Sequence, residues 1–263
     1  MIAGLFDMAE NECTCLGERG RSRARLTWTT ITSVPDAQTA IVYDLAPQPA
    51  QLCRPFLSDE ENGLVASFPE ARANAFATGR FCARAVIAQL LGCAPWCPSI
   101  IAEPGYQPRV EAPACRRFEK AGWTAIGVSF GYTKDRLLVA VAPGRSVGVD
   151  IENIAPADRS RSRDIEAIAE TVFSADQRRA LGRAEPGRRN ALFHKFWTRH
   201  EAYVKATGEG LVIPAEPIRS AHNDCVIVDL ELGDCYEGAV VTTNPPCAVH
   251  LVAGPGPKRP PGT

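Results

Sequence analysis

The sequence has no long apolar run, no short-period repeat and no strong excess of charge of either sign. No apolar stretch approaches the roughly 20 residues of a transmembrane helix, so we expect no membrane span. The opening "MIAGLFDMAENECTCLGERG" carries early acidic residues and no apolar core, which predicts no secretory signal. The formal net charge is -1 and the pI about 6.4. This balance gives no indication of nucleic acid or a membrane surface as partner.

Lysine is scarce, whereas cysteine is not. The positive charge is mostly arginine, and lysine occurs only at Lys120, Lys134, Lys195, Lys205 and Lys258. The chain has 10 cysteines. Without a secretory signal, we interpret them as free thiols in a reducing, cytoplasmic setting. The spacings Cys13-x-Cys15 and Cys93-x3-Cys97 lack a matching second pair or a nearby histidine pair, which disfavours a structural zinc site.

The length of 263 residues and the 45% hydrophobic content predict one large domain or two packed halves. The order "helix, then strands" occurs twice, which suggests two similar α+β halves. We expect a loose N-terminal arm over 1–24, a first half over 25–152, a second half over 153–254 and a disordered tail over 255–263.

Capping signals place three helices. One runs from Pro69 to the glycine at 92, a second follows the capping box of Ser174 and Gln177, and a third runs from Gly187 to the glycines at 208 and 210. We expect the third helix to bury its Phe193, Trp197 and Val204 side against a sheet. A charged loop is expected over 155–164, and strands over 26–33, 39–46, 124–130, 136–142, 147–154, 225–232, 238–243 and 247–253.

The stretch "VGVDIENI" places two carboxylates inside an apolar strand. Residues two apart on a strand point the same way, so Asp150 and Glu152 share one side. Two like charges held this close require a positive partner. Taken alone, the pattern is common, and a solvated strand end explains it equally well.

A second group of polar residues lies in "FWTRHEAYVKATGEGL". Trp197, Glu201 and Lys205 are four residues apart and so share one helical stripe. A surface Glu–Lys pair is the alternative interpretation, worth only about 0.2–0.5 kcal/mol. Together, the three carboxylates Asp150, Glu152 and Glu201 offer the oxygen ligands that Mg²⁺ prefers. A metal beside a lysine is the usual equipment for moving a phosphoryl group.

These two motifs, about 45 residues apart, resemble those of the 4'-phosphopantetheinyl transferases, specifically the Sfp-type and enterobactin-type branch. The family's first motif, hydrophobic-Gly-hydrophobic-Asp followed by hydrophobic-Glu, is filled by Gly148, Asp150 and Glu152. Its second motif is filled by Trp197, Thr198, Glu201, Ala202 and Lys205. The segment "VFSADQRRAL" resembles the family's Phe-Ser-x-x-Glu. The resemblance covers residues 55 to 215.

The helix over 69–92 also resembles a family helix that carries Gly-Arg and Ala-Arg. Arg72, Phe76, Arg80 and Arg84 repeat every four residues, which aligns three guanidinium groups on one face. A solvated basic stripe paired with acidic neighbours is one interpretation. The resemblance implies another, in which Arg80 and Arg84 clamp the 3'-phosphate or pyrophosphate of coenzyme A.

The chain departs from the family pattern at three places, each of which removes or weakens a cation. The family's Ser-His-Ser/Thr step corresponds to "VSFGYTKD", where Ser129 is kept, Tyr132 stands where His is expected and Thr133 follows. His200 replaces the lysine before the helix glutamate. The family's Gly-Lys-Pro is matched best by Tyr106-Gln107-Pro108.

The resemblance implies an α+β fold with pseudo-twofold symmetry, in which each half packs a helix on a small antiparallel sheet. It also implies Mg²⁺-dependent transfer of 4'-phosphopantetheine from coenzyme A to a serine of an apo acyl or peptidyl carrier protein, with release of adenosine 3',5'-bisphosphate. Polyketide and nonribosomal-peptide carriers of secondary metabolism are within this substrate class. We expect a monomer. Two alternatives stay open: a catalytically weakened module that binds coenzyme A or a carrier protein, and a metal-dependent nucleotide pyrophosphate hydrolase.

In the implied site, Asp150, Glu152 and Glu201 hold the metal, while Glu201, Lys205 and His200 are the catalytic residues. Glu201 takes the proton from the carrier serine, and Lys205 neutralises charge on the phosphates. The residues implied to contact coenzyme A are Arg80, Arg84, Gln107, Pro108, Ser129, Tyr132, Thr133 and Lys205.

Overall fold

The computed structural model describes residues 12–14, 25–27, 39–93, 98–101, 108–111, 123, 125–154, 162–208, 225–243 and 248–253. Its helices are α1 (Ala50–Cys53), the short 3-10 helix η1 (Arg54–Phe56), α2 (Asp59–Ser67), α3 (Glu70–Leu91), α5 (Ser162–Val172), α6 (Ala175–Arg183) and α7 (Pro186–Thr207). Its strands are β1 (Glu12–Thr14), β2 (Arg25–Thr27), β3 (Thr39–Leu45), β4 (Ser99–Ile101), β5 (Arg109–Glu111), β6 (Ile126–Tyr132), β7 (Leu137–Pro143), β8 (Val147–Asn153), β9 (Cys225–Asp229), β10 (Tyr236–Thr243) and β11 (Ala248–Ala253). Within these ranges, none of the helices combines the length and hydropathy needed to cross a bilayer.

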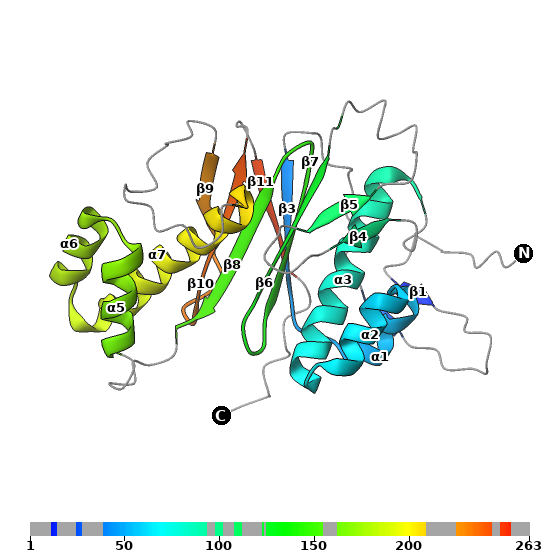
Figure 1. Cartoon of the computed structure of the whole chain (residues 1–263), viewed down its shortest axis with the longest axis horizontal. Helices are drawn as coiled ribbons and strands as arrows, with labels where there is room; N and C mark the ends of the chain where they lie inside the picture. The colour runs from blue at the N-terminus through cyan, green and yellow to red at the C-terminus, as the bar shows by residue number, and fades with distance from the viewer. Residues whose placement is uncertain are drawn as a thin grey trace, which may run out of the picture.

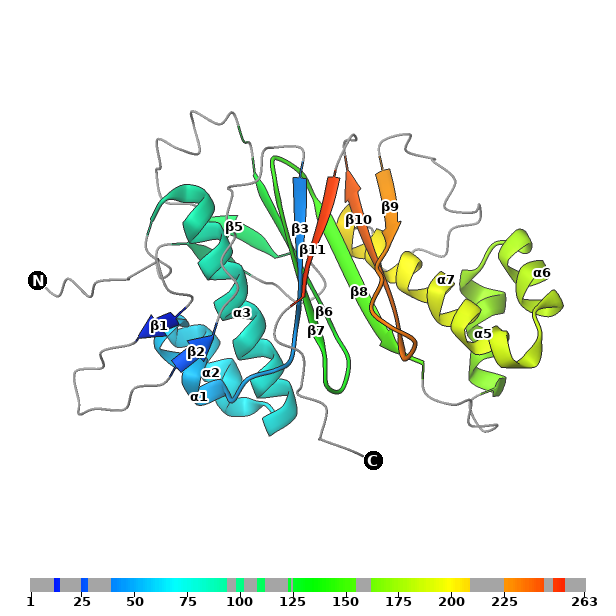
Figure 2. The same cartoon turned by 180° about the vertical axis from the view of Figure 1, so that it is seen from behind.

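Two sheets form the centre of the molecule, and each is covered by one long helix (Figures 1 and 2). One sheet has the order β8-β10-β9 and is antiparallel throughout. The other has the order β11-β3-β7-β6 and is antiparallel except for the parallel pair β11–β3. Helix α7 lies on the outer side of the first sheet, and α3 on the outer side of the second. The predicted α+β class, with helices on small antiparallel sheets, is confirmed.

Alternation along the strands divides the apolar side chains between two cores. Val147, Val149 and Ile151 of β8 are buried between the two sheets, where they share a cluster with Val42 and Leu138 of the other sheet. Because successive side chains point to opposite faces, their neighbours on β8 point toward α7.

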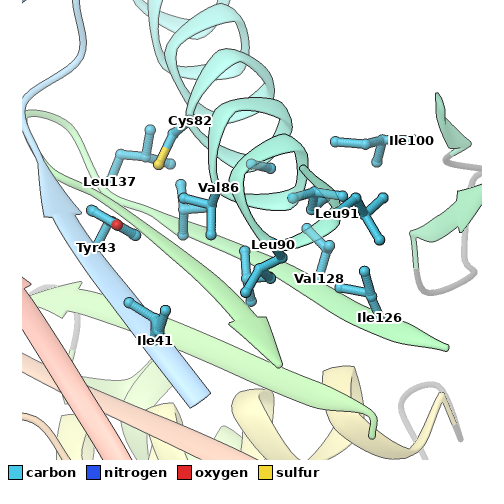
Figure 3. Close-up of a cluster of buried hydrophobic side chains, with 14 residues drawn as sticks. Ile41, Tyr43, Cys82, Val86, Leu90, Leu91, Ile100, Ile126, Val128 and Leu137 are labelled. Carbon is cyan, nitrogen blue, oxygen red and sulfur yellow. The ribbon is translucent and has the colours of Figure 1, made fainter. Parts of the chain in front are cut away.

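The second core lies between α3 and the outer face of the larger sheet (Figure 3). Helix α3 contributes Val86 and Leu90 to it, while β3 contributes Ile41 and Tyr43. All four side chains are at most 3% exposed. This core packs α3 on the larger sheet, just as the inter-sheet core packs the two sheets on each other.

The predicted helix ends are confirmed at three places. Gly92 ends α3 with φ 67°, and Gly208 ends α7 with φ 73°. Both glycines adopt the left-handed conformation that residues with a Cβ atom rarely take. The capping box at the start of α6 is formed by Ser174 and Gln177 in both directions.

Other parts of the sequence prediction were wrong or incomplete. The prediction gave no helix at α2 or α5, although α5 begins inside the predicted charged loop over 155–164. Strand β1 pairs with β2, so the predicted loose arm contains a short strand. The predicted strand over 26–33 overlaps the described residues only in β2, and the predicted tail over 255–263 lies outside them.

The face of α7 that meets the sheet also differs from the predicted one. Ala202 and Ala206, rather than Phe193, Trp197 and Val204, pack on β10. Phe193 instead lies 5.3 Å from the ring of Phe173, in a separate cluster formed with α5 and α6. Small side chains on the sheet-facing side let the backbone of α7 come close to the strands.

Candidate active site

Strand β8 presents a glycine and two carboxylates to α7. Gly148, Asp150 and Glu152 alternate with the apolar residues of the inter-sheet core, and so they lie on the opposite face. In the antiparallel pair with β10, Asp150 is opposite Ala239 and Glu152 is opposite Glu237. The shared face that the sequence predicts for Asp150 and Glu152 is confirmed.

Gly148 allows α7 to lie directly on this face of the strand. A Cβ atom at this position would be 2.5 Å from the backbone nitrogen of Ala206 and closer still to the carbonyl oxygen of Ala202. No side chain can be accommodated there without moving the helix away. The glycine of the first motif therefore sets the distance between the carboxylates of β8 and the residues of α7.

Lys205 of α7 bridges to Asp150 of β8. Its Nζ lies 2.7 Å from Asp150 Oδ1 and also donates a hydrogen bond to the carbonyl oxygen of Val149 at 3.2 Å. Asp150 is 7% exposed. Burial raises the pKa of Asp150, and the charge and hydrogen bond of Lys205 partly oppose this effect. The second carboxylate oxygen, Oδ2, is buried and accepts no hydrogen bond from the described residues.

Glu152 and Glu201 complete an acidic group around this pair. Burial raises the pKa of Glu152, and the charge of Asp150 raises it further, while a hydrogen bond from the Trp197 side chain lowers it. Burial also raises the pKa of Glu201, again reinforced by Asp150 and opposed by Lys205. The three carboxylates that the two motifs supply therefore lie close enough to affect one another's ionisation.

The chemistry of this group suits a hard cation. Three carboxylates share one lysine, and Asp150 Oδ2 is a buried oxygen donor that lacks a partner among the described residues. However, no set of three or more His, Cys, Asp or Glu side chains in the described part of the chain is arranged as a metal-binding cluster. The carboxylate oxygens thus fit Mg²⁺ by type. The side chains of Asp150, Glu152 and Glu201 would have to rotate for all three to bind one ion.

His200 lies inside the protein, although it neighbours Glu201 in the sequence. It is 2% exposed, and its ring centroid lies 6.2 Å from that of Trp197. Burial lowers its pKa, which favours the neutral ring at neutral pH. A buried neutral ring supplies no positive charge where the family pattern has a lysine, so His200 is not part of the catalytic group that we propose.

The residues implied to contact coenzyme A are spread along β6 and beside β5. Ser129 is buried, and its Oγ accepts a hydrogen bond of 3.1 Å from the backbone N–H of Val149, next to Asp150. Tyr132, at the end of β6, is 56% exposed. Thr133 follows it, and Pro108 directly precedes β5. Gln107 lies outside the described residues.

Arg80 and Arg84 do not form an exposed phosphate clamp. Both side chains are buried, and both pair with Glu61 of α2. The spacing of four residues correctly predicts that they share one face of α3, but this face is turned into the protein. Arg72, the first arginine of the predicted stripe, is exposed. Its guanidinium group lies 4.2 Å from the ring centre of Phe68.

Sequence reasoning missed the contacts of two residues in this region. Trp197 belongs to the predicted stripe on α7 and to the family's second motif, but neither predicts that its side chain donates a hydrogen bond to Glu152. Glu61 was not considered at all. The capping-box spacing of Ser58 and Glu61 was available as a signal for it, since both hydrogen bonds of that box are formed.

The fold and this site define a mixed α+β protein in which a helix and a strand bring together three carboxylates and a lysine. Residues 146–237, which include β8 and α7, match the family model of the 4'-phosphopantetheinyl transferase superfamily. The resemblance to this superfamily that the two motifs indicate is thereby confirmed.

Similar curated proteins are named 4'-phosphopantetheinyl transferases. The chain is 30% identical to the 4'-phosphopantetheinyl transferase psf-1 of Bacillus pumilus over 128 residues, which is 43% of this chain and 52% of that protein. It is 28% identical to the 4'-phosphopantetheinyl transferase HetI of Nostoc over 149 residues, or 55% of each chain. It is 33% identical to the 4'-phosphopantetheinyl transferase AcpT of Salmonella typhi over 85 residues, or 32% of this chain and 42% of that protein. The chain thus spans about half the length of these relatives.

Proposed function

We propose that the protein transfers 4'-phosphopantetheine from coenzyme A to a serine of an apo acyl or peptidyl carrier protein and releases adenosine 3',5'-bisphosphate. The observation that carries this proposal is the meeting of Asp150, Glu152, Glu201 and Lys205 between β8 and α7. This group lies within the segment that matches the superfamily. Acidic oxygen donors beside a lysine suit the neutralisation of a pyrophosphate.

In this proposal, Asp150, Glu152 and Glu201 hold Mg²⁺. When bound, the metal would neutralise charge on the pyrophosphate of coenzyme A. Glu201 accepts the hydroxyl proton of the carrier serine as the serine oxygen attacks the β-phosphate of coenzyme A. The raised pKa of Glu201 suits this task, because a carboxylate with a higher pKa is a stronger base.

Lys205 supplies a second positive charge for the phosphates of coenzyme A. Its Nζ is held by Asp150 and by the carbonyl oxygen of Val149. In this position it stabilises the charge that develops on the phosphates as the bond to the leaving nucleotide breaks. The lysine therefore belongs both to the catalytic group and to the coenzyme A site.

We further propose that Pro108, Ser129, Tyr132 and Thr133 contact coenzyme A, together with Gln107. Ser129 supports this placement, because its hydroxyl is bound to the backbone one residue before Asp150. A cytoplasmic location and a monomeric state complete the proposal.

Analysis of the reaction products tests the proposal. The protein is incubated with coenzyme A and Mg²⁺, with and without a panel of apo carrier proteins, and the nucleotide and phosphopantetheine products are separated by chromatography. We expect adenosine 3',5'-bisphosphate only when a carrier is present, and none after chelation of the metal. Free phosphopantetheine formed without a carrier would indicate a hydrolase instead, and binding without any product would indicate an inert module.

A further inference from the structure

Three charged side chains are buried together between α2 and α3. Glu61, Arg80 and Arg84 are each at most 5% exposed. An Arg84 nitrogen lies 2.8 Å from Glu61 Oε2, and Arg80 Nε lies 3.6 Å from Glu61 Oε1. Burial of charge is costly unless the groups are paired and hydrogen bonded. We refer to these three residues as the buried triad.

One terminal nitrogen of each arginine donates to the backbone ahead of or within β4, whereas Arg84 Nε is buried and has no hydrogen-bond partner among the described residues. Arg84 donates to the carbonyl oxygen of Pro98, and Arg80 donates to that of Ile100 at 3.4 Å. The Arg80 guanidinium also lies 5.1 Å from the ring centre of Phe130 on β6. Both guanidinium groups are buried and paired with Glu61, so a phosphate that bound them would compete with that carboxylate.

Glu61 connects the arginines to the start of α2. Its Oε2 atom accepts a hydrogen bond of 2.9 Å from the backbone N–H of Ser58, in the capping box of that helix. The same oxygen is bound by Arg84. One carboxylate therefore joins the first turn of α2 to α3 and, through the arginines, to the backbone at β4.

The strand held in this way belongs to a small ribbon beside the proposed coenzyme A site. Strand β4 pairs with β5, with Ile101 opposite Arg109. Pro108 directly precedes β5, and β5 contacts β6, the strand that carries Ser129 and Tyr132. Displacement of β4 would thus move Pro108 relative to β6.

We propose that Glu61, Arg80 and Arg84 are positioning residues for coenzyme A: the buried triad anchors the β4–β5 ribbon and holds Pro108 in place without touching the substrate. This inference rests on the proposed function for the identity of the substrate. It assigns the arginines of α3 a role different from direct binding of phosphate.

The variant Glu61→Gln separates the two roles by the sign of its effect. If the arginines position the ribbon, loss of the carboxylate charge releases them and raises the KM for coenzyme A by about tenfold, with little change in kcat and in the KM for the carrier protein. If they bind phosphate directly, removal of their competing anion leaves that KM unchanged or lowers it. Glu60→Gln is the matched control, since Glu60 is exposed in the same helical turn and the charge change is identical.

A second variant and a second measurement cover a possible loss of folding in Glu61→Gln. Arg84→Lys keeps the charge but cannot reach Glu61 and the Pro98 carbonyl together, and we expect the same change in KM. Hydrogen exchange should show faster amide exchange in β4 and β5 for both variants, but not for Glu60→Gln. A merely structural role would lower the amount of active enzyme without changing KM.

An unchanged or lowered KM for coenzyme A in both folded variants would overturn the inference, as would unchanged exchange in β4 and β5. The wild-type protein serves as the test of the proposed function. If it transfers nothing, the proposed function fails and the coenzyme A part of the inference fails with it. If it transfers and the variants behave as the wild type does, only the inference fails.

Discussion

Asp150 is a buried carboxylate with two different oxygen atoms. Oδ1 is bound by Lys205, whereas Oδ2 accepts no hydrogen bond within the described part of the chain. Burial raises its pKa, and its charge in turn raises the pKa of Glu152 and of Glu201. Such a group is poorly stabilised by the protein alone, and a bound cation would stabilise all three carboxylates together.

Neutralisation of single carboxylates tests this arrangement. We expect Asp150→Asn and Glu201→Gln each to lower kcat of transfer by about 10²–10⁴-fold, because each removes a proposed metal ligand and Glu201 is also the proposed base. The rate is measured from the formation of modified carrier protein. Glu237→Gln is the control, since Glu237 lies opposite Glu152 on the same sheet but outside the catalytic group. Wild-type rates in either active-site variant would contradict the assigned roles.

At the scale of residues, the sequence predicted which side chains of β8 and α3 share a face, but it did not predict which residues they contact. The two-residue period of β8 placed Asp150 and Glu152 on one side, as the structure has them. The four-residue period of α3 likewise aligned Arg80 and Arg84, but it could not show whether that face meets solvent. Their partner Glu61 is 23 residues from Arg84, and a contact over that distance depends on tertiary packing.

At the scale of elements, the site depends on how closely α7 lies on β8. We expect Gly148→Ala to force the two apart, because the new methyl group would overlap the backbone at Ala202 and Ala206. The free energy of unfolding should fall by about 1–3 kcal/mol or more, and transfer should be lost even in the folded fraction. Denaturant unfolding and single-turnover assays measure the two effects.

Gly182→Ala provides the matched control for this substitution. Nothing lies within 4 Å of a Cβ atom at position 182, which is within α6. Alanine favours a helix over glycine by about 1 kcal/mol, so this variant should be as stable as the wild type or more stable. Equal stability of the two variants would show that Gly148 is not required for the close approach.

An ion pair also fixes α7 on the sheet. Arg199 makes two hydrogen bonds, of 2.7 and 2.6 Å, to Asp229 of β9, and Lys195 lies 2.9 Å from the same carboxylate. Burial alone would raise the pKa of Asp229, but the hydrogen bonds from Arg199 and Lys195 lower it overall. A lowered pKa stabilises the folded state above the unfolded value of about 3.9, and this stability is lost as the pH falls through the folded value.

Asp229→Asn should therefore lower the free energy of unfolding by about 0.5–1 kcal/mol at neutral pH, since the pair is partly exposed to solvent. The difference from the wild type should shrink as the pH falls below about 3.9 and disappear once the pH is below the lowered pKa of Asp229. Denaturant unfolding at several pH values measures it, with Glu166→Gln at the more exposed pair with Arg189 as the control. A difference that does not change with pH would mean that the carboxylate charge is not responsible.

Prediction of the helices succeeded at α3, α6 and α7 but missed α2, although α2 begins with the same kind of capping box as α6. Helices α3, α6 and α7 have a proline, a capping box or a left-handed glycine at their ends. Helix α5 has no such residues in the sequence pattern, and its start falls within a charged stretch. The sheet-facing side of α7 was also mispredicted, because large apolar residues usually mark the buried face. Here small residues are needed at the contact with β8.

At the scale of the whole molecule, the last strand joins the two predicted halves. Strand β11 follows β10 in the sequence but pairs in parallel with β3 of the first half. Val252 of this strand packs against the core under α3, whereas Leu251 is exposed. No local pattern predicts this crossing, because strand pairing between distant segments depends on the assembled fold. The division of the chain into two halves at residue 152 stays a prediction.

Because β11 links both parts, we expect the molecule to unfold in one cooperative transition. Val252→Asp should lower the free energy of unfolding by about 2 kcal/mol, since it places a charge against the core. Leu251→Asp, on the exposed side of the same strand, should have little effect. Thermal unfolding followed by circular dichroism and by tryptophan fluorescence would contradict this view if the two signals changed at different temperatures.

In the proposed function, a carrier protein receives phosphopantetheine at the group formed by Asp150, Glu152, Glu201 and Lys205. Intact-mass spectrometry of an apo carrier protein, incubated with coenzyme A, Mg²⁺ and this protein, tests it most directly. We expect a gain equal to one phosphopantetheine group, lost when the carrier serine is changed to alanine or when Asp150→Asn replaces the wild type. No gain on any acyl or peptidyl carrier of a broad panel, or an equal gain with Asp150→Asn, would contradict it.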